Sequence, residues 1–207
     1  KKKIFIDDNS SLSGNTTQIK KNFHKLCVGA ASKITLKEDS KIYRLHRIIY
    51  NPIWCDDIYG LKNIFIEFCK VRNFLLKLKP NFCITKKIEK NLWSANRILQ
   101  YPIGGGHMSS HSDFIVKKIN NKNKINKFYQ LILNLTEYKK DFYSGGAYIK
   151  FKNKKIFLEN KLQSGDILIY HGNSVHGVDE IDPHRKLDLI KFNGRIVLMN
   201  SLYQYKY

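Results

Sequence analysis

One stretch of the sequence decides the fold class: Leu162-Gln163-Ser164-Gly165-Asp166-Ile167-Leu168-Ile169-Tyr170. A polar turn at Ser164-Gly165 leads at once into a short apolar run, which is typical of a turn that feeds a buried strand. Similar runs, separated by Gly or Asn, recur after Trp93 at 97–101, 128–135, 147–151, 155–158 and 195–202. Regularly spaced short strands predict a mostly β protein, either an antiparallel barrel or a double-sheet jelly roll.

Before these runs, residues 56–79 are the strongest helix candidate. One apolar face repeats at three-and-four spacing through Leu61, Ile64, Phe65, Phe68 and Val71 or Arg72. Asp56 or Asp57 is expected to cap the start, and Pro80 ends the helix. Further upstream we expect a loop at 8–15 and a strand around 41–45. Predicted strands therefore lie both before and after the helix along the chain.

The composition of the 207 residues, 43% hydrophobic and 13% aromatic, suits a chain with a substantial core and excludes a disordered one. No apolar run approaches the roughly 18 residues that a bilayer span needs, and the apolar start at residues 4–6 ends at Asp7-Asp8. We therefore expect no membrane partner and a cytoplasmic location. The four cysteines form no CxxC pair, which favours buried thiols over a zinc knuckle or a disulfide framework.

The net charge of +20 raises the question of a nucleic-acid partner. The excess is mostly Lys, accompanied by Asn and Ile, as in the Lys/Asn-rich segment 117–127, which we expect to be a mobile surface loop. Aromatic residues do not alternate with the basic runs in the way that base stacking requires. The pattern favours a solvated basic surface over a nucleic-acid interface.

The residues that carry chemistry are His111-Ser112-Asp113. If this segment is extended, the imidazole and the carboxylate point to the same face, because side chains alternate along a strand. His176, in Ser174-Val175-His176-Gly177, is the candidate for a third ligand. Two histidines and one carboxylate on one side of a metal leave its other positions open, which is the usual iron(II) arrangement for oxygen activation.

Further motifs surround these residues in a fixed order. Gly145-Gly146 follows the run 130–135, Ser164-Gly165-Asp166 precedes the strand before His176, and Asn193-Gly194 precedes Arg195 at the start of the last run. In this order, residues 95–203 resemble the 2-oxoglutarate- and iron(II)-dependent oxygenases, most nearly the prolyl 4-hydroxylase-like branch.

The resemblance implies a double-stranded β-helix core and a set of site residues. His111, Asp113 and His176 match the metal ligands, and Arg195 matches the basic residue that binds the distal carboxylate of 2-oxoglutarate. In that branch the basic residue usually follows the second His at a shorter interval, where Arg185 and Lys186 lie. We favour Arg195 because it opens an apolar strand and because a guanidinium offers a bidentate fork to a carboxylate.

Alternation extends the predicted site to its neighbours. Arg97, Leu99 and Tyr101 share one strand face; Tyr101 is assigned to the cofactor pocket, and Arg97 and Gln130 to the substrate, with core packing as the alternative for each. His107, His171 and His184 are out of pattern and are expected to be structural or solvent-facing. Met108 stands where the hydroxylases often carry a tyrosine, which argues against a direct transfer of their peptide specificity.

The resemblance implies iron(II), 2-oxoglutarate and dioxygen as cofactors, with ascorbate as an optional reductant, and release of succinate and CO2. We expect hydroxylation of an unactivated C–H bond in a small molecule such as an amino acid or a natural-product precursor. The alternatives are a peptidyl hydroxylase, a nucleic-acid demethylase suggested by charge alone, and a β-barrel that binds a ligand or metal without oxygen chemistry. We expect one domain over 1–207, with N-terminal strands and the supporting helix in 1–94 and the main part of the core in 95–207.

Overall fold

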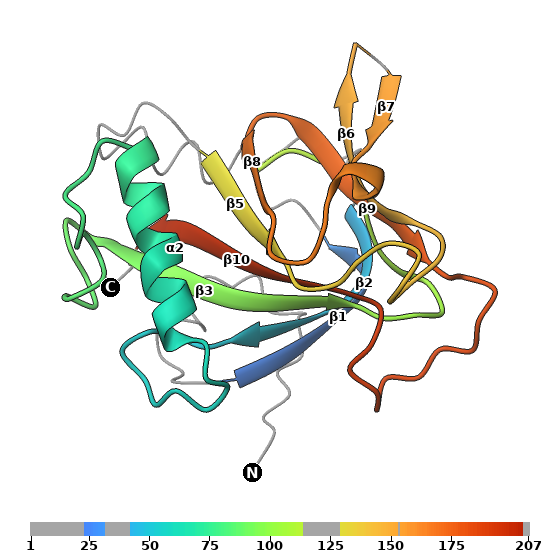
Figure 1. Cartoon of the computed structure of the whole chain (residues 1–207), viewed down its shortest axis with the longest axis horizontal. Coiled ribbons are helices and arrows are strands. Elements are labelled where there is room, and N and C mark those ends of the chain that lie inside the picture. Colours follow the sequence, from blue (N-terminus) through green and yellow to red (C-terminus); the bar gives the residue numbers. More distant parts are fainter. Residues whose placement is uncertain (1–22, 32–41, 114–128, 153, 205–207) are drawn as a thin grey trace.

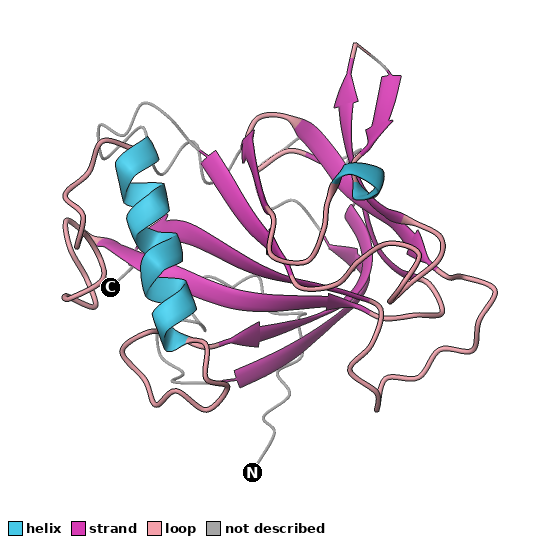
Figure 2. Cartoon of the chain, in the orientation of Figure 1, coloured by secondary structure: helices cyan, strands magenta, loops and turns pink. Residues whose placement is uncertain are grey.

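A computed structural model of the chain describes residues 23–31, 42–113, 129–152 and 154–204 (Figure 1). Strands are the main regular secondary structure of this part of the molecule, with one long helix and one short 3-10 turn (Figure 2). The elements, in chain order, are β1 Phe23–Ala31, β2 Ile42–Tyr50, α2 Lys62–Leu75, β3 Leu92–Tyr101, β4 Gly106–His111, β5 Tyr129–Asn134, β6 Gly146–Phe151, β7 Lys154–Phe157, η1 Glu159–Lys161, β8 Ile167–His171, β9 Val175–Ile181 and β10 Arg195–Gln204.

The order of the strands identifies the fold. The neighbours run β7-β6-β9-β4-β2-β3-β10-β5-β8, and all of these pairs are antiparallel. When β3 to β10 are counted from one to eight, one half of the sheet has the order 1-8-3-6 and the other has 2-7-4-5. These are the two four-stranded halves of a jelly roll. The predicted double-stranded β-helix core is therefore confirmed, and β2 joins its two halves while β1 pairs with β2.

The two halves face each other across an inner core. Alternate residues of β3 and β10, such as Leu99, Tyr101, Val197 and Met199, pack with Val178 of β9 in one buried cluster. The turn between β8 and β9 crosses from one half to the other. Side chains on the inner face of both halves are thereby directed toward one another.

The outer face of β3 and β10 is covered by α2 (Figure 1). Phe65 packs there against Ile98 and Leu198, because α2 turns Phe65, Phe68, Cys69, Arg72 and Asn73 inward. The helix is shorter than predicted, and Arg72 rather than Val71 completes the buried face. The prediction was also wrong for Ile64, which is 41% exposed.

The N-cap residue of α2 is Leu61 rather than Asp56 or Asp57, but Asp57 still binds the start of the helix. The Asp57 carboxylate accepts hydrogen bonds from the N–H groups of Leu61 and Lys62, at 2.9 and 3.2 Å. These N–H groups lie at a helix start, where they have no partner within the helix. The helix ends at Leu75, several residues before Pro80, so the chain leaves the helical path before proline could block it.

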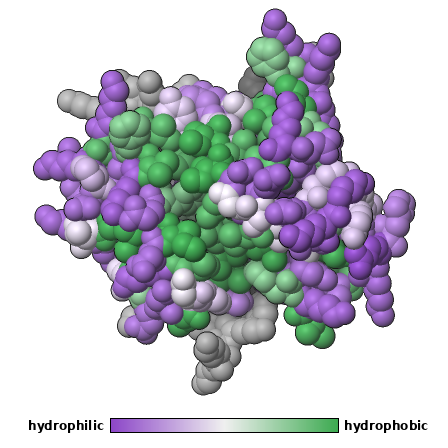
Figure 3. Space-filling view, in the orientation of Figure 1, coloured by the Kyte–Doolittle hydropathy of each residue, from purple (hydrophilic) through white to green (hydrophobic). Residues whose placement is uncertain are grey.

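Three strands were not predicted from the sequence: β1, β4 and β9. The expected loop at 8–15 and the Lys/Asn-rich segment 117–127 lie outside the described residues. All four cysteines are buried as free thiols. In the face shown in Figure 3, apolar residues gather near the centre and hydrophilic residues surround them. Within the part of the chain described here, no helix has both the length and the apolar character that crossing a membrane requires.

Candidate metal centre

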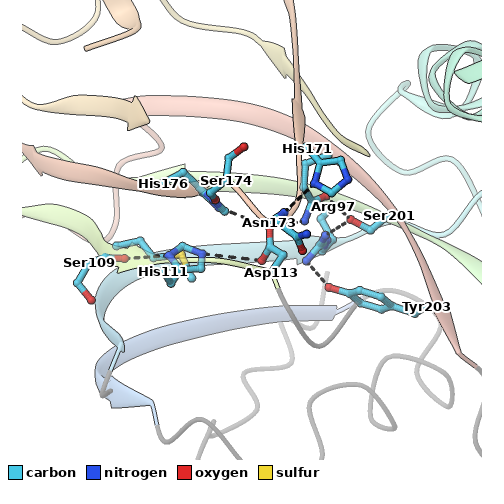
Figure 4. Close-up of polar contacts among 12 residues, drawn as sticks. Arg97, Ser109, His111, Asp113, His171, Asn173, Ser174, His176, Ser201 and Tyr203 are labelled. Atoms are coloured by element: carbon cyan, nitrogen blue, oxygen red, sulfur yellow. Dashed lines mark hydrogen bonds and ion pairs between the residues drawn. The ribbon is translucent and has the colours of Figure 1, made fainter. Parts of the chain in front are cut away.

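Three side chains from different parts of the chain meet on the inner face. His111 ends β4, His176 lies on the neighbouring β9 directly opposite it, and Asp113 follows β4 by two residues. One ligand atom from each residue lies within 4.8 Å of the other two. The Nε2 atoms of His111 and His176 are 3.9 and 3.5 Å from the two Asp113 carboxylate oxygens (Figure 4). The three side chains can therefore hold one metal ion from one side.

Both imidazoles are oriented for metal binding by the backbone. His111 Nδ1 is 2.8 Å from the carbonyl oxygen of Ser109, and His176 Nδ1 is 2.9 Å from that of Ser174 (Figure 4). A carbonyl oxygen only accepts, so each Nδ1 carries a proton, and Nε2 is the ring nitrogen that remains to bind a metal. Metal-binding histidines in proteins usually have this second contact, which fixes the ring and its tautomer.

Arg195 lies on the same inner face, at the start of β10. It is 2% exposed, and its Nε donates to Glu159 Oε1 at 2.5 Å. The same oxygen accepts the N–H of Ala147 at 2.7 Å. Arg195 Nη2 is buried and has no hydrogen-bond partner among the described residues. A buried guanidinium nitrogen without an acceptor is unusual and costly, and a bound carboxylate would satisfy it.

The Gly-Gly turn before β6 makes room for this ion pair. A Cβ at Gly146 would lie 2.4 Å from Glu159 Cγ, and one at Gly145 would lie 2.0 Å from the carbonyl oxygen of Glu180. Both glycines also have positive φ, which other residues rarely adopt. The motif noted in the sequence is thus needed to bring Glu159 to Arg195.

One buried tyrosine lies beside Arg195 and another lies beside His176. The Tyr101 ring lies 5.8 Å from the Arg195 guanidinium carbon, and the Tyr101 hydroxyl is 4.0 Å from the sulfur of Met108. The Tyr170 ring lies 4.7 Å from the His176 ring. Burial, followed by the Asp113 charge, raises the pKa of Tyr170 well above its ordinary value, so this hydroxyl stays protonated and can donate inside the core.

His46 is a member of the site that sequence reasoning missed. It lies on β2, is 3% exposed, and its ring is 5.3 Å from that of Tyr101. Burial lowers the pKa of His46 to about 3, with further contributions from Arg44 and Lys25. The imidazole is therefore neutral at physiological pH. His46 lies just beyond the strand predicted around 41–45, and no sequence motif marked it as a site residue.

The other predicted site residues are also on the inner face. Gln130 Nε2 donates to Asp113 Oδ2 at 2.7 Å, and Arg97 donates to the hydroxyls of Tyr203 and Ser201 (Figure 4). Both are buried. Their assignment to the substrate stays a prediction.

The other basic residues and histidines considered in the sequence analysis lie outside the cluster of candidate ligands. Arg185 is exposed in the β9–β10 connection, where it pairs with Asp182 at 3.5 Å, and Lys186 is exposed beside it. His184 is exposed, and His107 is half-buried with its Nδ1 on the carbonyl oxygen of Gly105. Of these basic residues, Arg195 alone is buried on the inner face.

No protein-family model matches the chain, and no curated protein matches it. Its fold is similar to that of a prolyl-4-hydroxylase from Pseudomonas putida, at 12% identity and a TM-score of 0.46, over 84% of this chain and 77% of that one. A 2OG-Fe(II) oxygenase family oxidoreductase from Burkholderia pseudomallei is 9% identical, with a TM-score of 0.40, over 98% and 95% of the two chains. A cupin superfamily protein from Desulfitobacterium hafniense is 15% identical, with a TM-score of 0.28, over 58% and 84%. These likenesses are distant, so the fold rests on the strand order and the site on the side-chain positions.

Proposed function

We propose that this protein is an Fe(II)- and 2-oxoglutarate-dependent dioxygenase that hydroxylates an unactivated C–H bond of a small molecule. The observation that carries the proposal is the meeting of His111, Asp113 and His176, with one ligand atom of each within 4.8 Å of the others. Two imidazoles and one carboxylate on one side of the site are the ligand set that suits iron(II) in oxygen-activating enzymes.

The residues present also fit 2-oxoglutarate. Arg195 Nη2, buried without an acceptor among the described residues, is suited to the far carboxylate, and the Tyr101 hydroxyl lies on the same face. When bound, iron(II) would activate dioxygen, which is the oxidant: one oxygen atom would go to 2-oxoglutarate as it is converted to succinate and CO2, and the other to the substrate. The protein holds both groups in place and surrounds them with the apolar side chains of the inner core.

A small-molecule substrate, such as an amino acid or a natural-product precursor, is favoured by the side chains near Tyr101. Met108 packs against the inner core cluster and contacts Tyr101 there, at a position where the peptide hydroxylases that the sequence resembles often carry a tyrosine. The thioether offers only a weak hydrogen-bond acceptor. Peptide recognition that depends on a tyrosine hydroxyl at this position would be lost, which is why we favour a small-molecule substrate.

The proposal is tested by titrating the protein with Fe(II) and then with 2-oxoglutarate under nitrogen, and by following succinate release in air. We expect 2-oxoglutarate to bind only when the metal is present. His176→Ala should weaken metal binding by more than about 100-fold, since even neighbours of metal ligands contribute 10–100-fold. His171→Ala, a half-buried histidine outside the triad, is the matched control and should bind normally.

Panels of amino acids, peptides and methylated oligonucleotides then identify the substrate class. Succinate release stimulated by amino acids or similar small molecules supports the proposal. Stimulation by peptides alone would replace the small-molecule substrate with a peptidyl one. Absence of any metal-dependent 2-oxoglutarate binding would leave a β-barrel without oxygen chemistry.

A further inference from the structure

Asp113 differs from the two histidines in how the backbone holds it. His111 and His176 lie on paired strands, opposite each other, whereas Asp113 lies beyond the end of β4. Its N–H donates to the carbonyl oxygen of Gly172 at 2.8 Å, which fixes the backbone. That bond leaves the carboxylate free to rotate about its side-chain torsions unless a second contact holds it.

The second contact is Gln130, whose Nε2 donates to Asp113 Oδ2 at 2.7 Å. Gln130 is itself held, because Ser201 Oγ donates to Gln130 Oε1 at 2.9 Å. Arg97 Nη2 in turn donates to Ser201 Oγ at 2.8 Å. Gln130, Ser201 and Arg97 are 2%, 1% and 7% exposed, so water does not compete for these bonds.

This series of hydrogen bonds begins at the Arg97 guanidinium and ends at the Asp113 carboxylate, and these two groups determine which atom donates at each step. A guanidinium only donates, so Ser201 Oγ must accept from Arg97 and direct its own hydrogen to Gln130. An ionised carboxylate only accepts, so the Gln130 amide must present its nitrogen to Asp113. Both ends therefore assign the same orientation to the Gln130 amide, and a flipped amide would lose both of its bonds.

The hydrogen bonds of Gln130 and of the two terminal nitrogens of Arg97 all go to protein groups, whereas Arg97 Nε is buried without a hydrogen-bond partner among the described residues. Gln130 uses its oxygen for Ser201 and its nitrogen for Asp113. Arg97 uses Nη1 for the Tyr203 hydroxyl, at 2.6 Å, and Nη2 for Ser201. In Figure 4, Arg97 and Ser201 lie beyond Asp113 as seen from the two histidines.

We propose that Gln130 is a positioning residue for the Asp113 carboxylate and that Ser201 and Arg97 fix the orientation of its amide. The proposal rests on the proposed function, in which Asp113 binds the metal. A hydrogen bond from the Gln130 side-chain amide to one Asp113 carboxylate oxygen leaves the other oxygen for the metal, so that Asp113 occupies a single coordination position. The remaining positions then stay open for the cosubstrate and dioxygen.

The experiment measures the affinity and visible spectrum of Co(II), used as a probe without 2-oxoglutarate or oxygen. In Gln130→Leu we expect Co(II) to bind about 10- to 100-fold more weakly, with a changed absorption spectrum. The matched control is Gln100→Leu. Gln100 is 1% exposed, and its amide donates to the backbone oxygens of Lys191 and Asn193, away from Asp113. This variant should lose stability but keep the affinity and the spectrum.

Ser201 provides a second and smaller change that preserves packing. Ser201→Ala removes the hydroxyl that orients the amide and should weaken Co(II) binding about 2- to 10-fold, the effect of one hydrogen bond. Ser201→Thr keeps the hydroxyl and should restore the affinity. If Gln130→Leu does not fold, the comparison of Ser201→Ala with Ser201→Thr tests the positioning role.

Wild-type affinity and spectrum in Gln130→Leu, or equal affinities in the Ser201→Ala and Ser201→Thr variants, would overturn the positioning role. Failure of the wild-type protein to bind Co(II) would instead contradict the proposed metal site. The two failures are distinguishable because the wild-type protein is measured first.

Discussion

Two buried arginines, Arg72 on the outer face of the sheet and Arg195 on the inner face, differ in how their donors are used. Arg72 makes five hydrogen bonds, to Asn73 (twice), Ser94, Asn200 and the carbonyl oxygen of Phe82. Arg195 has one ion pair, with Glu159, while its Nη2 has no hydrogen-bond partner among the described residues. Both are almost completely buried, at 1% and 2% exposure.

The difference separates a structural arginine from one that is available to a ligand. A guanidinium has five donors, and the outer face satisfies those of Arg72 with neutral oxygens from α2, β3 and β10. The inner face leaves Arg195 incompletely satisfied in a part of the molecule that also holds His111, Asp113 and His176. We therefore expect substitutions on the outer face to lower stability, and substitutions on the inner face to lower ligand binding.

The largest effect is expected on the outer face. Arg72→Met leaves the oxygens of Asn73, Ser94 and Asn200 buried without their donor, so the free energy of unfolding should fall by about 3–5 kcal/mol. Urea unfolding measures this loss. Lys70→Met, on the same helix but partly exposed beside Glu67, should change it by less than about 0.5 kcal/mol. Equal losses in the two variants would remove the distinction between the two faces.

The next effect is expected at Arg195. Removing it alone would leave the Glu159 carboxylate buried without its ion-pair partner, so the informative variant is the double change Arg195→Gln with Glu159→Gln. We expect its affinity for 2-oxoglutarate, measured by calorimetry on the metal-loaded protein, to fall about 10- to 100-fold, since bonds to charged groups contribute about 1.5–3 kcal/mol. Unchanged affinity would assign the cosubstrate carboxylate to another residue.

The buried His46 on the inner face should make the free energy of unfolding of the metal-free protein depend on pH. Folded His46 has a pKa of about 3, below its ordinary 6.5, so the unfolded state binds more protons between these values. Stability contributed by the neutral ring is present above pH 6.5 and is lost as the pH falls toward 3, by about 2 kcal/mol at pH 5. Urea unfolding at pH 7 and pH 5 should show a smaller loss in His46→Leu, whereas exposed His184→Leu should behave as wild type.

The smallest effect is expected at Tyr101. Tyr101→Phe keeps the buried ring beside Arg195 and removes only the hydroxyl, whose contact within the described structure is the weak acceptor Met108. Stability should change little, while 2-oxoglutarate affinity should fall by up to about 10-fold, the effect of one hydrogen bond. Tyr43→Phe, which alters an exposed tyrosine, serves as the control for both measurements. Loss of stability without loss of affinity would make Tyr101 a core residue only.

Strands with apolar runs that end at Gly or Asn were predictable from the sequence, because these residues mark the turns between strands. β4 and β9 carry the two candidate histidine ligands, yet they were missed because polar residues and glycine interrupt their apolar residues and their ladder with each other contains register shifts. His111 and Asp113 were still placed near each other correctly, since a two-residue separation constrains them locally. His176 lies close to these two residues because β9 pairs with β4, and this pairing cannot be inferred from the sequence around His176.

The partners of the buried charges could not be predicted for the same reason. Glu159 comes from η1, before β8, and its side chain can reach Arg195 at the start of β10 because Gly146 has no Cβ to occupy the same space. Arg72 fits the helical repeat about as well as Val71, and the choice depends on acceptors supplied by Ser94 and Asn200. Spacing from His176 favoured Arg185, but the β9–β10 connection leaves Arg185 exposed.

The placement of His111 and His176 on neighbouring strands far apart in sequence also bears on how the chain folds. Every β4–β9 contact closes a long loop, and such non-local pairing makes folding slow. The coordination sphere cannot exist before this pairing has formed, so a metal that binds the assembled site favours the native state by mass action. Under the proposed function, iron supply would influence the lifetime of the folded protein.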